Sequence, residues 1–202
     1  MDFYENFAHL KEHEVESTDY RIRAREGSSG TVILAPHGGR IERGTSQVAE
    51  AIAGDEHGFY AFEGLKPDVK SNRVLHITSN HFDEPTALSI VSRAQRVITI
   101  HGAKGMESAI YFGGLDLELR ARSREAFRYS GILAKDDPSP TRQGKGRLNI
   151  CNRGRSGRGL QVELTFGLRK RLFYPSACNQ KWEPSALFYE IIECFRLVLM
   201  HR

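Results

Sequence analysis

Two histidines and a glutamate have the types and the spacing expected of a metal centre. His37 directly follows a short apolar run at residues 31–36, and His101 follows a second run at residues 96–100. Glu42 lies five positions beyond His37, after two flexible glycines. Two imidazoles and one carboxylate are a ligand set of catalytic zinc, whose open position activates a water molecule. The compact HExxH pattern is missing, so ordinary polar loop residues remain the simpler alternative.

Glu163 is a candidate for proton transfer. It lies in the alternating segment 160–166, where Leu160, Val162 and Leu164 share one strand face and Glu163 lies on the other. A carboxylate inside a sheet is costly unless it is paired or used. Beside a metal centre it has a use as general base and proton shuttle. The alternative left open is an edge strand on which Glu163 is merely solvated.

The positive charge of the chain is concentrated in one segment. The 202 residues carry 29 Lys+Arg against 25 Asp+Glu, a net charge of +4, and without this segment the remainder is slightly acidic. Guanidinium groups bind carboxylates and phosphates, so a polyanion is the expected partner. Nucleic acid is not expected, because the segment has no aromatic residue for base stacking; a solvated loop is the alternative. The segment, residues 138–162, has no acid and contains Arg142, Lys145, Arg147, Arg153, Arg155 and Arg158.

The elements that must position these residues alternate between strands and helices. This order predicts an α/β fold with a mixed, mostly parallel sheet and helices on both faces. In such sheets the functional loops lie beyond the carboxyl ends of the strands. We predict strands at 31–36, 73–78, 96–100, 109–112 and 159–166, and helices at 3–13, 45–54, 115–131 and from 184 onward, with a further helix carrying Leu88, Val91 and Ala94.

Composition excludes several classes of protein. With 40% hydrophobic and 27% charged residues the chain is typical of a globular protein, and its length suits one catalytic domain, 1–202. It has no apolar run of about 20 residues for a membrane helix, and its acidic start is unlike a signal peptide. Cys151, Cys178 and Cys194 form no CxxC pair, which favours free thiols in a reducing compartment. We therefore expect a monomer synthesised in the cytoplasm.

Five segments, in the same order along the chain, resemble the phage poly-γ-glutamate hydrolase family and its relatives from Bacillus-type prophages. They are residues 35–42, 75–85, 100–102, 149–153 and 159–163. The similarity extends over nearly the whole chain. It implies a fold similar to that of the zinc carboxypeptidases, with one zinc ion at the strand ends.

The resemblance also implies roles for individual residues. Carboxypeptidases have two residues between their first two zinc ligands, whereas four lie between His37 and Glu42, as in the hydrolase family. His76 is expected to line the cleft and bind substrate or to support a ligand, and no role is assigned to His81. The implied set is His37, Glu42 and His101 as zinc ligands, Glu163 as general base, and Arg153 with Asn152 as the grip on a substrate carboxylate.

The expected function is zinc-dependent hydrolysis of the γ-glutamyl amide bonds of poly-γ-glutamate. Arg153, with Arg147, Arg155 or Arg158, would hold the carboxylates of this polymer. For a phage, removing the polyglutamate capsule of the host would open access to the cell surface, and the protein would be released on phage lysis. Two alternatives remain: a zinc peptidase or amidase of the same fold acting on another substrate such as cell-wall peptide, and a metal-free anion-binding module.

Overall fold

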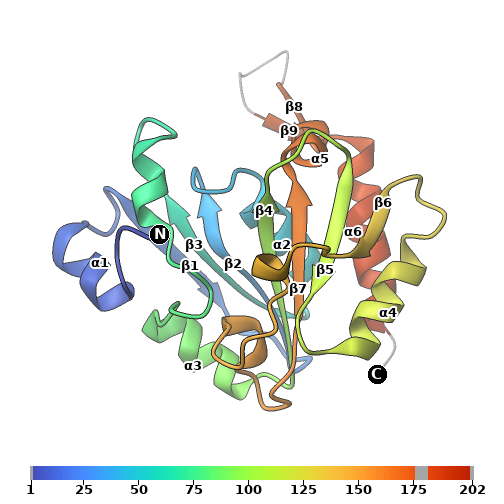
Figure 1. Cartoon of the computed structure of the whole chain (residues 1–202), viewed down its shortest axis with the longest axis horizontal. Helices are drawn as coiled ribbons and strands as arrows, with labels where there is room; N and C mark the ends of the chain where they lie inside the picture. Colours follow the sequence, from blue (N-terminus) through green and yellow to red (C-terminus); the bar gives the residue numbers. More distant parts are fainter. Residues whose placement is uncertain (1, 176–181, 201–202) are drawn as a thin grey trace.

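A seven-stranded sheet lies at the centre of the protein (Figure 1), in a computed structural model that describes residues 2–175 and 182–200. Cys178 lies outside the described residues. A small separate sheet pairs β8 (Phe173–Pro175) with β9 (Trp182–Pro184). The strand order of the main sheet is β1-β3-β2-β4-β7-β5-β6, with β1 at Tyr20–Arg25, β2 at Thr31–Gly39, β3 at Gly58–Gly64, β4 at Arg96–Ala103, β5 at Ala109–Gly113, β6 at Leu133–Asp136 and β7 at Leu160–Thr165.

The sheet is mixed and mostly parallel, as predicted. The pairs β2–β3, β2–β4, β4–β7 and β5–β6 are parallel, whereas β1–β3 and β5–β7 are antiparallel. Figure 1 shows β2, β4 and β7 in the middle of the sheet, with α5 and the β8–β9 pair beyond their carboxyl ends at the top of the view. The candidate site residues are therefore expected at this end.

Helices cover both faces of the sheet, which confirms the predicted layers. One core includes Val48, Leu119, Leu168 and Phe195, from four helices on the same side. The other includes Phe7, Val91 and Ile150, from the opposite side. The first side has α2 (Thr45–Ala53), α4 (Leu117–Ala126), α5 (Phe166–Arg171) and α6 (Ala186–Met200), and the second has α1 (Phe7–His13), α3 (Pro85–Arg93) and the 3-10 turn η3 (Ile150–Asn152).

The strand predicted at 73–78 is wrong. A 3-10 helix, η1 (Ser71–Leu75), occupies part of that segment, and the loop after it contains His76. Leu75 and Ile77 are fully buried in the core beside α1 and α3, so their apolar character reflects packing from an irregular backbone. The missing strand is β3, in which all seven residues are buried. Its aromatic run between Gly58 and Gly64 was a readable strand signal.

Two further differences affect the site. β2 and β4 continue beyond their predicted ends, so His37 and His101 lie inside strands. The edge strands β1 and β6 were not predicted. β7 lies between β4 and β5, which excludes the edge-strand alternative for Glu163.

Other expectations concern cysteines and membranes. Cys151 is buried and Cys194 half-buried, and both are free thiols. In the described part of the chain, none of the helices combines the length and the apolar character needed to cross a bilayer.

Candidate metal centre and active site

The ends of β2, β4 and β7 bring the candidate residues together. His101 of β4 is paired in register with Glu163 of β7, so the two side chains are neighbours on one face. β2 shifts its register between Ala35 and Gly38. A Cβ on Gly38 would lie 2.1 Å from Ser46 Oγ of α2, so a larger residue could not come this close to the helix. The turn that follows places Glu42 beside the two strand ends.

His37, Glu42 and His101 form a tight cluster. The Nδ1 atoms of the two histidines are 3.2 Å apart. The Glu42 carboxylate approaches His37 Nδ1 to 3.6 Å and His101 Nδ1 to 3.9 Å. Two ligands of tetrahedral zinc are about 3.3 Å apart when each metal–ligand bond is about 2.0–2.1 Å. The three groups therefore have nearly the mutual spacing of zinc ligands.

The chemistry of the cluster also suits a cation. His37 Nε2 lies 2.8 Å from the carbonyl of Ile77, and donation to that oxygen leaves the lone pair on Nδ1, facing the cluster. The Glu42 carboxylate accepts from the backbone N–H of Gly102 at 2.8 Å. Among the described residues, His101 Nε2 is buried without a hydrogen-bond partner. The Nδ1 atoms of both histidines and the Glu42 carboxylate face one small space, and His101 Nε2 points elsewhere without a protein partner among the described residues.

The pKa values of Glu42, His101 and His37 favour binding of a cation by these three side chains. Burial raises the pKa of Glu42, but its two histidine neighbours outweigh burial and bring it down to about 2. Burial, and then the neighbouring charge of His37, lowers the pKa of His101 to about 3. Burial lowers the pKa of His37, but Glu42 more than reverses this and the net direction is upward. Positive charge is therefore favoured next to the Glu42 carboxylate.

His76 adjoins the cluster through its ring. It stacks on His37 with ring centroids 4.0 Å apart and an interplanar angle of 28°. Asp2 bonds His76 Nδ1 at 2.9 Å and the Thr78 backbone N–H at 2.6 Å. One ligand atom each from His37, Glu42 and His76 lie within 4.8 Å of one another. The N-terminal segment thus fixes the His76 ring against the centre.

Glu163 is buried and held by an amide relay. Its Oε1 accepts from Gln161 Nε2 at 3.1 Å, and Gln161 Oε1 accepts from Asn149 Nδ2 at 2.9 Å. Burial raises the pKa of Glu163 well above its usual value, with Glu42 and Asp137 adding to the rise. A carboxyl group with a raised pKa is suited to both accepting and returning a proton near neutral pH.

The sequence interpretation missed several of these supporting residues. Gln161 was readable, because it lies two positions before Glu163 and therefore on the same strand face. Arg142 has its guanidinium fixed by the buried carboxylate of Asp137 at 3.0 and 3.1 Å, and its charge opposes the rise in the pKa of Glu163. No local pattern connects Asp2 with His76.

The side-chain amide of Asn152 is hydrogen-bonded to the loop around it. Its Nδ2 donates to the carbonyls of Gly144 at 2.7 Å and Gly146 at 2.9 Å. Its Oδ1 accepts from the backbone N–H groups of Leu115 and Gly159. All four positions of the buried amide are occupied, so Asn152 organises the loop and has no donor left for a substrate carboxylate.

Arg153 lies in an open groove. The groove has a volume of about 820 Å³ and is also lined by Asp2, Thr78 and His81. Asp2 and Thr78 are the residues that contact each other beside His76. Arg153 is half-buried, and its Nη1 lies 3.4 Å from the carbonyl of Phe82. The groove therefore lies next to the metal-centre residues and presents one guanidinium group.

The basic segment 138–162 does not act as one surface. The backbone N–H of Arg155 bonds the carbonyl of Ala94, just before β4 begins. Arg158 directly precedes Gly159 and the start of β7. Both arginines therefore lie at the amino ends of strands whose carboxyl ends carry His101 and Glu163. This position does not favour Arg155 or Arg158 as contacts to a substrate beside the centre.

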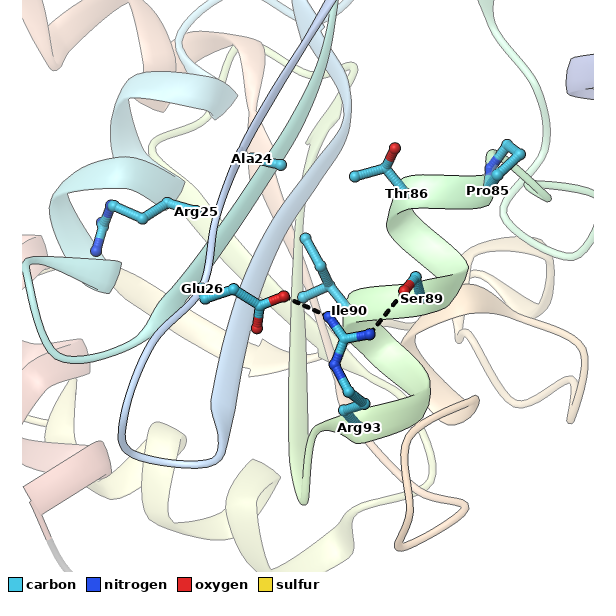
Figure 2. Close-up of a pocket in the computed structure, with 8 residues that line it drawn as sticks. All are labelled: Ala24, Arg25, Glu26, Pro85, Thr86, Ser89, Ile90 and Arg93. Carbon is cyan, nitrogen blue, oxygen red and sulfur yellow. Dashed lines mark hydrogen bonds and ion pairs between the residues drawn. The ribbon is translucent and has the colours of Figure 1, made fainter.

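A second groove is unrelated to the centre. Figure 2 shows it between the end of β1 and α3, where Glu26 forms an ion pair with Arg93. Arg93 Nη1 also donates to Ser89 Oγ at 2.7 Å. None of the cluster residues lines this groove.

Known proteins resemble this chain over nearly its whole length. The sequence model described as poly-gamma-glutamate hydrolase matches residues 4–194. The UPF0714 protein YndL of Bacillus subtilis is 40% identical over 176 residues, which cover 85% of this chain and 67% of YndL. A bacteriophage poly-gamma-glutamate hydrolase structure matches with a TM-score of 0.89 and 28% identity, covering 98% of this chain and 96% of the other. A structure described as zinc-free YNDL-apo matches with a TM-score of 0.90 and 37% identity, covering 100% and 98%.

Proposed function

Because the chain belongs to the poly-gamma-glutamate hydrolase family, we propose that it is a zinc-dependent hydrolase that cleaves the γ-glutamyl amide bonds of poly-γ-glutamate. One observation carries the proposal. The Nδ1 atoms of His37 and His101 and the Glu42 carboxylate lie within 3.9 Å of one another, and Glu163 is the register partner of His101. The zinc-free description of one similar structure adds support for the metal.

His37, Glu42 and His101 are the proposed ligands of one zinc ion. His76 is the competing third ligand, since it also lies within 4.8 Å of the other two groups. Its ring stacks on that of His37, however, and its Nδ1 already bonds Asp2 outside the cluster. His101 Nδ1 lies 3.2 Å from His37 Nδ1 and 3.9 Å from the Glu42 carboxylate, and its ring is tilted by 58° to that of His37. His76 is therefore better placed to orient His37 and to line the substrate site.

Glu163 is the proposed general base. Bound zinc would supply Lewis acidity that polarises the scissile carbonyl and favours ionisation of water. Glu163 accepts the proton of the attacking water and returns it to the leaving amine. Gln161 keeps the Glu163 carboxylate oriented during both transfers. Accepting and then returning a proton suits Glu163, because it is a buried carboxyl group with a raised pKa.

Arg153 is the proposed contact to substrate carboxylates. Poly-γ-glutamate carries one α-carboxylate per residue, and a guanidinium group binds a carboxylate through two parallel hydrogen bonds. Arg153 lies in the wall of the groove beside His76, which has a volume of about 820 Å³. Arg147 belongs to the same basic segment and remains a second candidate contact.

The remaining proposals concern the setting of this activity. The whole chain, 1–202, acts as one catalytic domain and as a monomer on an anionic polymer, without nucleic acid. It is made in the cytoplasm and reaches capsule polymer when a phage lyses its host.

The test follows polymer length in the presence and absence of metal. Purified protein incubated with poly-γ-glutamate should shorten the polymer, a zinc chelator should stop this, and added zinc should restore it. His101→Ala should lose bound zinc and activity, whereas His13→Ala, on the exposed side of α1, should retain both. Full activity in chelator would refute the proposal.

Other outcomes identify the alternatives. Metal-dependent cleavage of a cell-wall peptide, with the polymer left intact, would indicate another substrate for the same chemistry. Binding of the polymer without zinc and without cleavage would indicate an anion-binding module.

A further inference from the structure

Arg169 of α5 connects the three segments that carry the candidate centre. Its guanidinium donates to three backbone carbonyls: Nε to Leu164 at 3.1 Å, Nη1 to Arg43 at 2.8 Å and Nη2 to Ala103 at 3.3 Å. Each acceptor is one or two positions beyond a residue of the site. These neighbours are Glu163 before Leu164, Glu42 before Arg43 and His101 before Ala103.

The contact with β4 is close enough to require glycine. A Cβ on Gly102 would lie 2.6 Å from Arg169 Cζ, so the guanidinium rests directly against the backbone that follows His101. The N–H of the same residue donates to the Glu42 carboxylate at 2.8 Å. Arg169 therefore packs on the peptide that helps to hold Glu42.

The charge of Arg169 is unusual in its surroundings. Its side chain is half-buried, and within the described residues no carboxylate lies within ion-pair distance of it. Its hydrogen-bond acceptors are neutral carbonyls, while the carboxylates of Glu42 and Glu163 act on it through space. A guanidinium offers several donors in a rigid planar fork, which an ammonium group cannot reproduce. Three carbonyls from three chain segments use this property.

We propose that Arg169 is a positioning residue that holds the Glu42 turn and the ends of β4 and β7 in the arrangement needed for metal binding and proton transfer. This rests on the proposed function, because it assigns no separate activity. The plainer explanation is that Arg169 only stabilises α5, where its guanidinium lies 5.9 Å from the centre of the Phe166 ring. The two explanations predict different metal sites in a folded variant.

Arg169→Lys tests the proposal, because it keeps the charge and removes the planar fork. Arg171→Lys is the matched control, since it makes the same change two positions along the same helix at an exposed side chain that bonds Ser108 Oγ. Gly102→Ala is the complementary variant, because it keeps the guanidinium and displaces it from β4. Circular dichroism and thermal unfolding report whether each variant folds.

The expected result is a changed metal site in a folded protein. In Arg169→Lys and Gly102→Ala, zinc affinity from chelator competition should fall about 10- to 100-fold, as for other residues that orient metal ligands. The visible spectrum of the Co²⁺-substituted protein should change, and kcat should fall with KM within about twofold. Arg171→Lys should match the wild type in all of these measurements.

Other outcomes overturn the proposal. The proposal is refuted if folded Arg169→Lys keeps the zinc affinity and the Co²⁺ spectrum of the wild type. It is also refuted if both test variants fail to fold, because Arg169 would then be a structural residue of α5. The metal measurements use no polymer, so a wild type that binds zinc but leaves poly-γ-glutamate intact refutes only the substrate. A wild type that binds neither zinc nor Co²⁺ refutes both proposals.

Discussion

Replacing Glu163 by glutamine isolates proton transfer from the rest of the site. The side chain keeps its size, and its amide oxygen can accept the hydrogen bond that Gln161 Nε2 now donates to Glu163 at 3.1 Å. Position 163 is only 6% exposed, so the neighbouring core limits any other rearrangement. Glu163→Gln therefore removes the ability to take up a proton and leaves the geometry almost intact.

The expected loss of rate follows from this single role. A positioned general base contributes about 10²- to 10⁴-fold, so kcat should fall by that factor, equivalent to about 3–5 kcal/mol in activation free energy. KM should change little, because substrate carboxylates are bound elsewhere. Zinc should remain bound, since Glu163 is not among its proposed ligands.

The same substitution should also change how the unfolding free energy depends on pH. In the metal-free protein the pKa of Glu163 is raised, so the native state holds this proton more tightly than the unfolded chain does. The associated stabilisation is present below the carboxyl group's usual pKa and is lost as the pH rises through the raised value. Metal-free Glu163→Gln has no such loss, so its unfolding free energy should depend less on pH than that of the metal-free wild type.

The assay measures polymer shortening, zinc content and unfolding on the same preparations. Glu118→Gln, an exposed change on α4, is the control and should behave as the wild type. A Glu163→Gln protein that retains zinc and a kcat within about threefold of the wild type would remove Glu163 from the mechanism. Loss of zinc from this variant would instead make Glu163 a ligand.

Three further predictions concern the surroundings of the centre. Arg153→Ala should raise KM for the polymer about 10-fold or more, because a charged hydrogen bond to substrate is lost. Arg155→Ala, at the amino end of β4, should leave KM unchanged. Equal effects of the two substitutions on KM would contradict the assignment of the substrate to the groove that contains Arg153. Gln161→Leu should cost about 1–3 kcal/mol in denaturant unfolding, because it leaves Asn149 Nδ2 without its acceptor, and should also lower kcat. Asp2→Asn should weaken the orientation of the stacked histidine beside the cluster and lower kcat/KM by a few-fold, and an unchanged value would show that this contact is dispensable.

Part of the fold could be predicted because its signals are local. The alternation of strands and helices gives the layers and the mixed sheet, and the apolar runs before His37 and His101 identify two of its central strands. The segment 73–78 was misinterpreted because buried Leu75 and Ile77 produce a similar apolar pattern without strand pairing. Periodicity reports which side chains are buried, and an irregular loop that enters the core satisfies it as well as a strand does.

The basic segment illustrates a different limit. Six cations in 25 residues suggest one anion-binding surface, but the chain crosses the protein within that stretch. Residues just before a strand lie at its amino end, and functional loops in such sheets lie at the carboxyl end. Arg155 and Arg158 precede β7 and could have been excluded on that ground, whereas the place of Arg153 in the groove depends on the path of the loop.

The residues that would hold the centre together differ in kind from those that would perform its chemistry. The candidate ligands His37 and His101 could be found because they follow apolar runs, and the candidate base Glu163 because it is a charged residue inside an alternating strand. Asp2 contacts His76 across 74 positions of sequence, and Arg169 contacts the carbonyl of Arg43 across 126. Gly102 shows no reason for being glycine until the Arg169 guanidinium is seen against it. Residues that position the centre can therefore be recognised only in the folded structure. Arg169→Lys and Gly102→Ala test one such contact, each by changing one of its two partners.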